Sequence, residues 1–368
     1  MWKYSNPVRI IFSDRFITQV SKIANSYKKP SILIITYKWF RHTETFKELE
    51  NELEEFKHYF DIEENPSFSS CQKAITFTKK IQPSTVIAIG GGSVIDTAKA
   101  VRMAVYKSCY DIRKLFSSSY KQVNKPLLIA IPTTHGTGSE LTMWATIWDK
   151  VNKKKYSLSE YNNYPDYAIY DVNLVKSLPT SVSFSSTLDA LSHSFEALWN
   201  KHSNPISDNF AMESIKLIID NLSKLVEPIP IEVRENLLIA SMYAGLAFSN
   251  TKTAAAHSIS YPLSAYFNVP HGIACSMSLY PLLKINEKAI QNKIANLLNV
   301  LQLSSIDEFW NKVLGTVKNR IPFSLHEYGI KKRDLNWLLD LSFTKDRMDN
   351  NVRELSKRDV FKILEEMY

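Results

Sequence analysis

Three short apolar segments, rich in β-branched residues, constrain the fold of this chain more than any other feature. They span residues 31–36, 85–90 and 127–131. Each is too short for a typical helix and is bounded by polar or turn residues, which indicates a buried strand. Segments with helical periodicity lie between and beside them, at residues 43–60, 68–81 and 94–103. Strands that alternate with helices in this way predict a parallel sheet covered by helices on both faces.

The second half of the chain has a different pattern. Shorter β-like segments follow at residues 144–148, 156–158 and 167–170, and the character changes at Leu178-Pro179. From Ser183 onward helical periodicity dominates and convincing strands are lacking. We therefore expect an α/β domain over residues 1–179 and an all-α domain over residues 180–368.

Composition argues against several classes of protein. A chain of 368 residues that is 45% hydrophobic can bury a large core, yet no run approaches ~20 apolar residues, so no membrane span is expected. The start lacks the apolar stretch of a secretory signal. Three scattered cysteines fit a reducing cytoplasm and predict neither disulfides nor a thiolate metal site. The formal charge of +8 is spread along the chain, which argues against a nucleic-acid partner.

Four residues have the chemistry of a metal site. Asp189 and His193 are four residues apart and share one face if the segment is helical. With His257 and His271 they give one carboxylate and three imidazoles, a set that suits Fe(II) or Zn(II) better than Mg²⁺ or Ca²⁺. Taken alone, the Asp189/His193 pair is more typical of a helix surface, and a lone histidine in an apolar helix is more typical of a hydrogen-bonded core residue. Spacing alone does not bring the four together.

Two glycine-rich turns follow predicted strands. Gly90-Gly91-Gly92-Ser93 leads into a helix, where backbone N–H groups and the helix dipole favour phosphate. The second turn, Thr133 to Ser139, adds hydroxyl groups and two glycines. The first turn alone is as consistent with a simple tight turn, since it matches neither a dinucleotide nor a P-loop pattern. Together, at the carboxyl ends of parallel strands, they favour a dinucleotide site.

Four longer motifs occur along the chain. They are Gly90-Gly-Gly-Ser-Val-Ile-Asp96-Thr-Ala-Lys99, Pro132-Thr-Thr-His-Gly-Thr-Gly-Ser-Glu140, Asp189-Ala-Leu-Ser-His193, and His257 through Ala274. In this order and at these intervals they resemble the iron-containing (group III) alcohol dehydrogenase family, on the dehydroquinate-synthase-like fold. The resemblance implies an N-terminal nucleotide-binding α/β domain and a C-terminal helical domain that binds Fe(II) or Zn(II) and is catalytic.

The resemblance also implies roles for individual residues. The metal ligands would be Asp189, His193, His257 and His271, the last of which also counts as catalytic. The residues that would contact NADPH or NADH are Gly91, Gly92 and Ser93 as a pyrophosphate cradle, with Asp96, Thr133, Thr134 and Thr137, and Lys155 near the ribose.

Three positions depart from the family pattern. Tyr37, with Lys38 and Arg41 nearby, stands where many members have an aspartate that binds the adenine ribose, so NADPH should be accepted. Tyr37 is equally consistent with a surface aromatic residue. His135 replaces a small residue and either contacts phosphate or fills space. Tyr261 replaces a histidine proposed as a proton relay, and is our candidate catalytic hydroxyl unless it merely packs.

Within the family, the closest likeness is to phosphonoacetaldehyde reductases, through Ala145-Thr-Ile-Trp-Asp149, Lys155-Tyr-Ser-Leu158, His257-Ser-Ile-Ser-Tyr261-Pro-Leu and Asn350-Asn351. It implies hydride transfer from NAD(P)H to phosphonoacetaldehyde, giving 2-hydroxyethylphosphonate.

A phosphonate needs cations, and three are candidates by their place in the chain: Lys252, Arg347 and Arg353. For each of them, an ordinary surface charge is the alternative interpretation. The alternatives are a reductase of butanal or succinic semialdehyde, a dehydroquinate-synthase-like lyase, and a non-catalytic nucleotide-binding protein. We expect a cytoplasmic homodimer.

Overall fold

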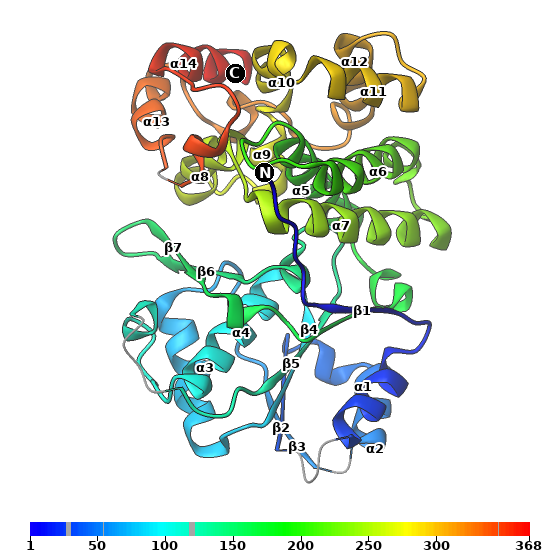
Figure 1. The fold of residues 1–368 in the computed structure, drawn as a ribbon, viewed down its shortest axis with the longest axis vertical. Helices are drawn as coiled ribbons and strands as arrows, with labels where there is room; N and C mark the ends of the chain where they lie inside the picture. The colour runs from blue at the N-terminus through cyan, green and yellow to red at the C-terminus, as the bar shows by residue number, and fades with distance from the viewer. Residues whose placement is uncertain (27–30, 54, 118–121, 345) are drawn as a thin grey trace. The chain divides into compact units, whose positions relative to one another are not determined.

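The computed structural model describes residues 1–26, 31–53, 55–117, 122–344 and 346–368 (Figure 1). The chain divides into two compact units. The α/β unit comprises residues 7–134 and 139–177, and the helical unit comprises residues 1–6, 135–138 and 178–368. The expected combination of an α/β part with an all-α part is confirmed. The assignment of residues 1–179 and 180–368 to two domains stays a prediction, because residues 1–6 and 135–138 group with the helical unit.

A six-stranded sheet forms the centre of the α/β unit. Its strands lie in the order β1-β8-β5-β4-β2-β3, and every pairing is parallel. The strands are β1 (Arg9–Phe12), β2 (Ile32–Thr36), β3 (Phe56–Tyr59), β4 (Thr85–Gly90), β5 (Leu127–Pro132) and β8 (Tyr167–Tyr170). All residues of β4 and β5 are buried, and these strands end side by side at the pair Gly90 and Pro132. Both glycine-rich turns therefore begin at the carboxyl ends of two neighbouring strands.

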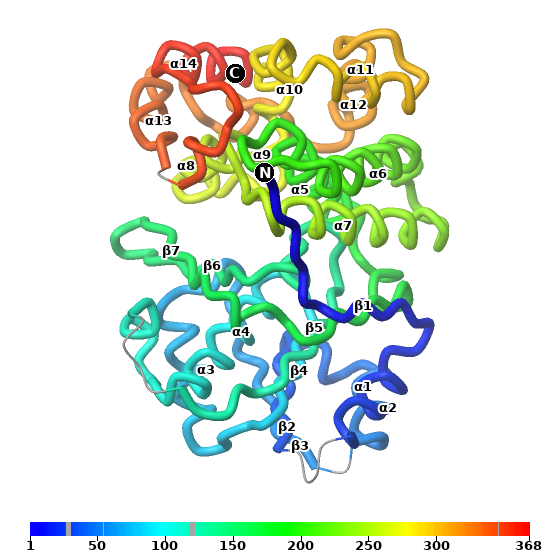
Figure 2. Tube along the Cα trace, viewed as in Figure 1, coloured from blue at the N-terminus to red at the C-terminus, as the bar shows by residue number. Residues whose placement is uncertain are grey.

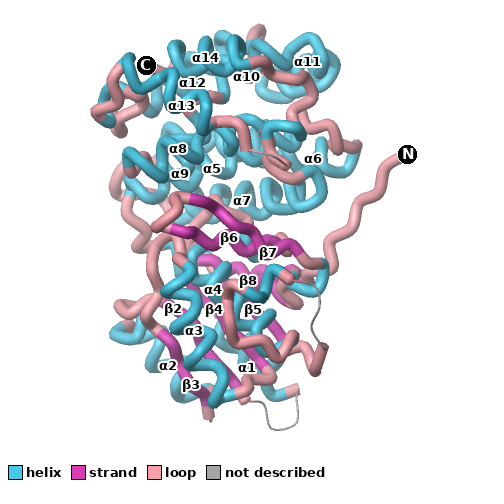
Figure 3. The backbone as a smooth tube through the Cα atoms, turned by 90° about the vertical axis from the view of Figure 1, so that its left-hand side faces the viewer, coloured by secondary structure: helices cyan, strands magenta, loops and turns pink. Residues whose placement is uncertain are grey.

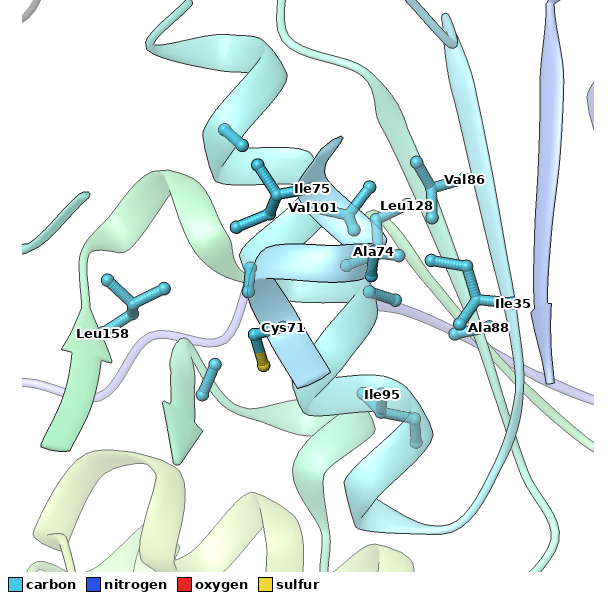
Figure 4. Packing of buried hydrophobic residues seen from close by; sticks show 14 of the residues in the cluster. Ile35, Cys71, Ala74, Ile75, Val86, Ala88, Ile95, Val101, Leu128 and Leu158 are labelled. Carbon is cyan, nitrogen blue, oxygen red and sulfur yellow. The ribbon is translucent and has the colours of Figure 1, made fainter. Parts of the chain in front are cut away.

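Helices cover both faces of this sheet, as the alternating side chains of β2 require. Leu33 and Ile35 pack with α3 (Phe68–Ile81) and α4 (Gly92–Tyr106), in the cluster shown in Figure 4. Ile32 and Ile34 point to the other face, against α1 (Phe16–Asn25) and α2 (Glu44–Glu52). The sheet is thus a buried central layer.

Two features of the α/β unit differ from expectation. The helix predicted over residues 43–60 ends at Glu52, and Phe56–Tyr59 forms β3, paired in parallel with β2. The pairing of an edge strand depends on a distant segment, and local periodicity does not report it. Strand β1, which lies at the other edge, and helix α1 have no counterpart among the predicted elements.

The β-like segments after residue 140 belong to two different structures. Strands β6 (Trp144–Asp149) and β7 (Lys154–Ser159) form a separate antiparallel hairpin, drawn in magenta in Figure 3. Strand β8 instead joins the main sheet between β1 and β5.

The helical unit is built around α5 (Thr180–Leu198). This helix packs against α6 (Pro205–Asn221), α7 (Ile231–Thr251), α8 (Ala255–Phe267) and α9 (His271–Ser276). Helices α6 and α7 run side by side (Figure 2). The remaining helices are α10 (Leu279–Asn286), α11 (Gln291–Leu301), α12 (Ile306–Val317), α13 (Leu335–Leu341) and α14 (Lys357–Glu366). Among the helices described, none has the length and apolar character that a membrane crossing requires.

Candidate metal centre and nucleotide turn

Helix α5 supplies two of the predicted metal ligands. Asp189 and His193 lie one turn apart on this helix and are only 4% and 5% exposed. Asp189 Oδ1 is 4.0 Å from His193 Nδ1. The two side chains therefore share a face, as their spacing predicted, but this face is buried, so the interpretation as a surface pair does not hold.

The other two predicted ligands come from α8 and α9. His257 Nε2 lies 3.5 Å from Asp189 Oδ1, and His271 Nε2 lies 3.9 Å from the same oxygen. Three imidazoles from three helices thus converge on one carboxylate oxygen. Ligand atoms about 2.1 Å from a tetrahedral zinc ion are themselves roughly 3.4 Å apart, close to the shorter of these separations.

Gly272 explains how α9 comes close enough to α5. A Cβ atom at this position would lie 1.9 Å from the backbone oxygen of Ser185 and 2.8 Å from Cβ of Asp189. Any residue with a side chain would push the two helices apart. The glycine that follows His271 is therefore part of the geometry that brings His271 to Asp189.

Glu196 contacts the cluster, although its sequence position did not single it out as a candidate. His257 Nδ1 donates to Glu196 Oε2 at 2.6 Å, and the backbone N–H of His257 donates to Oε1 at 3.0 Å. Burial would raise the pKa of Glu196, but the neighbouring His257 holds it below its usual range. With Nδ1 engaged as a donor, Nε2 of His257 faces Asp189 with its lone pair available. The signal was present, since Glu196 follows His193 by three residues on a helix.

Three buried polar atoms of this cluster lack partners in the described residues. Within the described residues, Asp189 Oδ1, His193 Nδ1 and His257 Nε2 are buried and accept or donate no hydrogen bond. Such atoms are rare, because burying a polar group without a partner is unfavourable. Burial would also raise the pKa of Asp189, but the imidazoles of His193, His257 and His271 hold it well below its usual range. An anionic oxygen facing imidazole nitrogens fits a divalent cation, either Fe(II) or Zn(II).

One side of the cluster is open. The His271 side chain is 34% exposed, whereas those of Asp189 and His257 are each 6% exposed. The ring of His193 is enclosed, stacked on Phe248 with centroids 4.0 Å apart and on His257 at 4.5 Å. A catalytic metal site needs such an accessible side for a reacting molecule, whereas a structural site is closed.

Cys275 is a further potential donor that was not expected. It lies one turn after His271 on α9, and its Sγ atom is 3.8 Å from His271 Nδ1 and 3.2 Å from Ser260 Oγ. The donor atoms of Asp189, His257, His271 and Cys275 all lie within 4.8 Å of one another. His193 flanks this group. The expectation that no thiol would stand at a metal site therefore overlooked a cysteine four residues after a predicted ligand.

The first glycine-rich turn lies in the α/β unit, where Gly91 caps α4. A Cβ atom on Gly90 would lie 2.4 Å from a methyl group of Val94. Only glycine at this position therefore allows strand β4 and helix α4 to approach this closely. Tyr37, directly after β2, packs against the same core cluster as α4, and burial raises the pKa of its hydroxyl. Tyr37 is therefore partly buried rather than fully exposed, and its contact with the cofactor stays a prediction.

The other predicted cofactor residues are more dispersed. Thr134 lies against Gly91, and its buried hydroxyl has no partner in the described part of the chain. Thr133 is also buried nearby in the α/β unit, and Thr137 groups with the helical unit. Lys155, on β7, has its ammonium 5.0 Å from the ring centre of Trp148.

Asp96 and His135 both have internal roles. The Asp96 carboxylate accepts from Ser139 Oγ at 2.6 Å and from the Thr146 backbone N–H at 2.8 Å, so it joins α4 to the segment that follows β5. His135 is fully buried, and its ring nitrogens lie 3.2–3.3 Å from hydroxyl groups on α5, one of them Thr187 Oγ1. Burial lowers the pKa of His135 to about 4. Of its two possible roles, packing is the one seen.

Comparison with known proteins covers both units. Residues 7–172 match the iron-containing alcohol dehydrogenase family, and residues 183–368 match the C-terminal part of the Fe-containing alcohol dehydrogenase family.

Individual relatives agree with this match. The chain is 32% identical over 321 residues to an NADPH-dependent butanol dehydrogenase of Clostridium saccharobutylicum, covering 83% of this chain and 82% of that protein. It is 30% identical over 300 residues to a 4-hydroxybutyrate dehydrogenase of Clostridium kluyveri, covering 78% and 79% of the two chains. A crystal structure of sulfoacetaldehyde reductase from Bifidobacterium kashiwanohense in complex with NAD⁺ superposes with a TM-score of 0.92 at 26% identity, covering 100% and 98% of the two chains.

Proposed function

We propose that this chain, which belongs to the iron-containing alcohol dehydrogenase family of oxidoreductases, is a metal-dependent aldehyde reductase that uses NAD(P)H. The observation that carries this proposal is the convergence of three imidazoles on one buried carboxylate oxygen. Unpartnered buried polar atoms beside a partly exposed histidine are more typical of a binding site than of a purely structural cluster.

Asp189, His193, His257 and His271 would hold the cation, with Cys275 as an additional donor and Glu196 fixing the ring of His257. Such a cation supplies Lewis acidity toward a carbonyl oxygen, and the nicotinamide supplies the hydride. The chain's own contribution is the orientation of the donors and a surrounding of low polarity, in which charge that develops on oxygen is stabilised most strongly.

Protonation of the product oxygen is assigned to groups on the open side of the cluster. Tyr261 lies one turn after His257 on α8 and is half-buried, so its hydroxyl is our candidate proton donor. His271 is a ligand candidate and, being partly exposed, would also lie next to a substrate that approaches from this side. A Tyr261→Phe variant should lower kcat while leaving the bound metal unchanged.

The turn at Gly91, Gly92 and Ser93 would bind the cofactor pyrophosphate at the N-terminus of α4. Tyr37, Thr133, Thr134, Thr137 and Lys155 remain candidate contacts. No carboxylate follows β2 to repel a 2′-phosphate, and Lys38 and Arg41 are exposed, so we propose that NADPH is accepted as well as NADH.

For the substrate we propose phosphonoacetaldehyde, reduced to 2-hydroxyethylphosphonate. The support is the set of motifs shared with phosphonoacetaldehyde reductases. The sulfoacetaldehyde reductase, with a name that denotes an anionic two-carbon aldehyde, is a consistent neighbour. Reduction of butanal or of succinic semialdehyde is the alternative, in keeping with the names of the two clostridial relatives.

The test compares initial rates with phosphonoacetaldehyde, butanal and succinic semialdehyde, using NADH and NADPH, after loading with Fe(II) or Zn(II). We expect net cofactor oxidation that is lost in a His257→Ala variant with an unchanged far-ultraviolet circular dichroism spectrum. A folded variant that keeps full activity would contradict the proposed role of the cluster. A reaction without net cofactor oxidation would favour a lyase.

A further inference from the structure

The segment from Ser342 to Asn351 is fastened to the helix that carries His257. Ser258 Oγ donates to the Ser342 carbonyl at 2.5 Å and accepts from the Thr344 backbone N–H at 2.9 Å. Asn350 Nδ2 donates to the Thr253 carbonyl at 2.8 Å. The described residues of this segment are therefore held against the beginning of α8 at both ends.

Arg347 stands between these two attachments. The charged or titratable side chains that act on its guanidinium are those of Glu196, Cys275 and Tyr261, all of which belong to the metal cluster or its edge. Burial lowers the pKa of the Arg347 guanidinium, yet a guanidinium still stays protonated in proteins. A fixed positive charge thus lies beside the proposed metal centre, within the helical unit.

The donors of this guanidinium are available. Within the described residues, the Arg347 side chain has neither a hydrogen-bond acceptor nor an ion-pair partner, although the residue is half-buried. Glu196, the carboxylate that acts on it, already accepts two hydrogen bonds from His257. A partly desolvated guanidinium without a carboxylate partner is suited to bind an anion from solution, because its paired N–H groups match two oxygens.

The other two candidate cations have different surroundings. Arg353 Nη2 lies 3.7 Å from Asp359 Oδ1, so this guanidinium already has a carboxylate beside it. Lys252 is exposed, with backbone in the left-handed region at φ 67°. The three cations that the sequence offered as equivalent are therefore not equivalent in the structure, and only Arg347 combines partial burial, free donors and the cluster as neighbour.

We propose that Arg347 binds the charged end of the substrate and so selects short aldehydes that end in an oxyanion, such as a phosphonate, sulfonate or carboxylate. This inference rests on the proposed function, because the aldehyde oxygen must lie at the metal cluster for Arg347 to meet the opposite end. It assigns the discrimination between charged and neutral aldehydes to one side chain.

Kinetics test this selectivity. An Arg347→Met variant should lower kcat/KM for phosphonoacetaldehyde and succinic semialdehyde by about 100-fold, or ~2.7 kcal/mol at 1.36 kcal/mol per factor of ten, mainly through KM. Its kcat/KM for butanal should stay within about 3-fold of wild type. Arg347→Lys should recover part of the loss, and Arg353→Met is the matched control that should change none of these values. An equal loss for all three aldehydes, or a wild-type enzyme that prefers butanal, would overturn the proposal.

Binding separates this inference from the reductase assignment. Calorimetric titration of the metal-loaded protein with ethylphosphonate, without cofactor, should give saturable binding that Arg347→Met abolishes and Arg353→Met preserves. If wild type oxidises no NAD(P)H with any aldehyde but still binds ethylphosphonate through Arg347, the anion site stands and the reductase proposal falls. If reduction proceeds but Arg347→Met binds ethylphosphonate as wild type does, the anion site falls alone.

Discussion

Two buried polar clusters, one in each unit, differ in how their polar atoms are hydrogen-bonded. In the α/β unit, Lys99 is fully buried, and its ammonium donates to the Ser139 and Trp144 carbonyls at 2.7 and 2.6 Å and to Thr142 Oγ1 at 3.2 Å. Burial lowers the pKa of Lys99 to about 8. In the helical unit, Asp189 Oδ1, His193 Nδ1 and His257 Nε2 face one another without such partners in the described residues.

This difference distinguishes a polar cluster that stabilises the fold from one that has the properties of a binding site. A closed set of hydrogen bonds, as at Lys99, holds a loop against a helix and leaves nothing for a ligand. An open set, in which several donors converge on one point and one of them is partly exposed, has an unmet electrostatic requirement. Substitutions in the two sets should therefore have different consequences: loss of activity at the open set and loss of stability at the closed one.

The largest expected effect is that of Asp189→Asn. The amide keeps the shape of the side chain but removes the negative charge on which three imidazoles converge. We expect turnover to fall by at least about 10³-fold, consistent with the several kcal/mol that a metal contributes to an activated carbonyl. Initial rates of NAD(P)H oxidation measure this. If the metal-loaded variant retained more than a tenth of wild-type activity, this would contradict the functional role assigned to the Asp189 cluster and its contrast with the Lys99 cluster.

Lys99→Met should act on stability instead. Removing the ammonium leaves several buried oxygens without a donor, which should destabilise the α/β unit by about 2–4 kcal/mol. Urea unfolding followed by circular dichroism measures this loss. The content of bound metal in the folded variant should stay at the wild-type level, and a metal-depleted but equally stable variant would contradict the comparison.

Glu196→Gln tests the carboxylate that orients the His257 ring. The amide keeps the size of the side chain but no longer offers His257 Nδ1 an anionic acceptor. Metal affinity should fall by about 10–100-fold, the range typical of such outer partners, with little change in the secondary structure. Competition with a chromophoric chelator gives the affinity. Unchanged affinity would show that Glu196 serves packing alone.

Cys275→Ser should have the smallest effect of the four. The thiol adds a soft donor to a set of nitrogens and one oxygen, so its removal should lower the preference for Zn(II) over Fe(II) by about tenfold. A Co(II)-loaded wild-type chain should show a thiolate charge-transfer band that is missing in Cys275→Ser and retained in the control Cys109→Ser. Identical spectra would remove Cys275 from the ligand set.

The sequence predicted the central strands better than the edge strands. It likewise indicated the four residues that converge on the cluster better than the groups that surround them. Strands β2, β4 and β5 are buried on both faces and carry continuous apolar runs, whereas β3 is partly exposed and gains its identity from pairing with β2. Helical spacing was enough to place Asp189 beside His193. His257 and His271 reach them only through the close approach of α9 to α5 at Gly272, which a family resemblance conveys and spacing does not.

The groups around the cluster were harder to foresee for the same reason. Cys275 and Glu196 each follow a predicted ligand by about one helical turn, which is a weak signal before the helices are packed. Arg347 lies 90 residues after His257, and its position depends on hydrogen bonds that the segment around it forms with Ser258 and with the Thr253 carbonyl. Long-range packing of this kind leaves little trace in local sequence.

The most direct test of the central claim is a titration of chelator-treated protein with Fe(II) or Zn(II), combined with diffraction at the absorption edge of the bound metal. We predict one ion per chain, bound by Asp189 together with the imidazoles of His193, His257 and His271, and no such binding by Asp189→Asn. Absence of saturable binding, or an ion bound elsewhere with these four residues empty, would contradict the account.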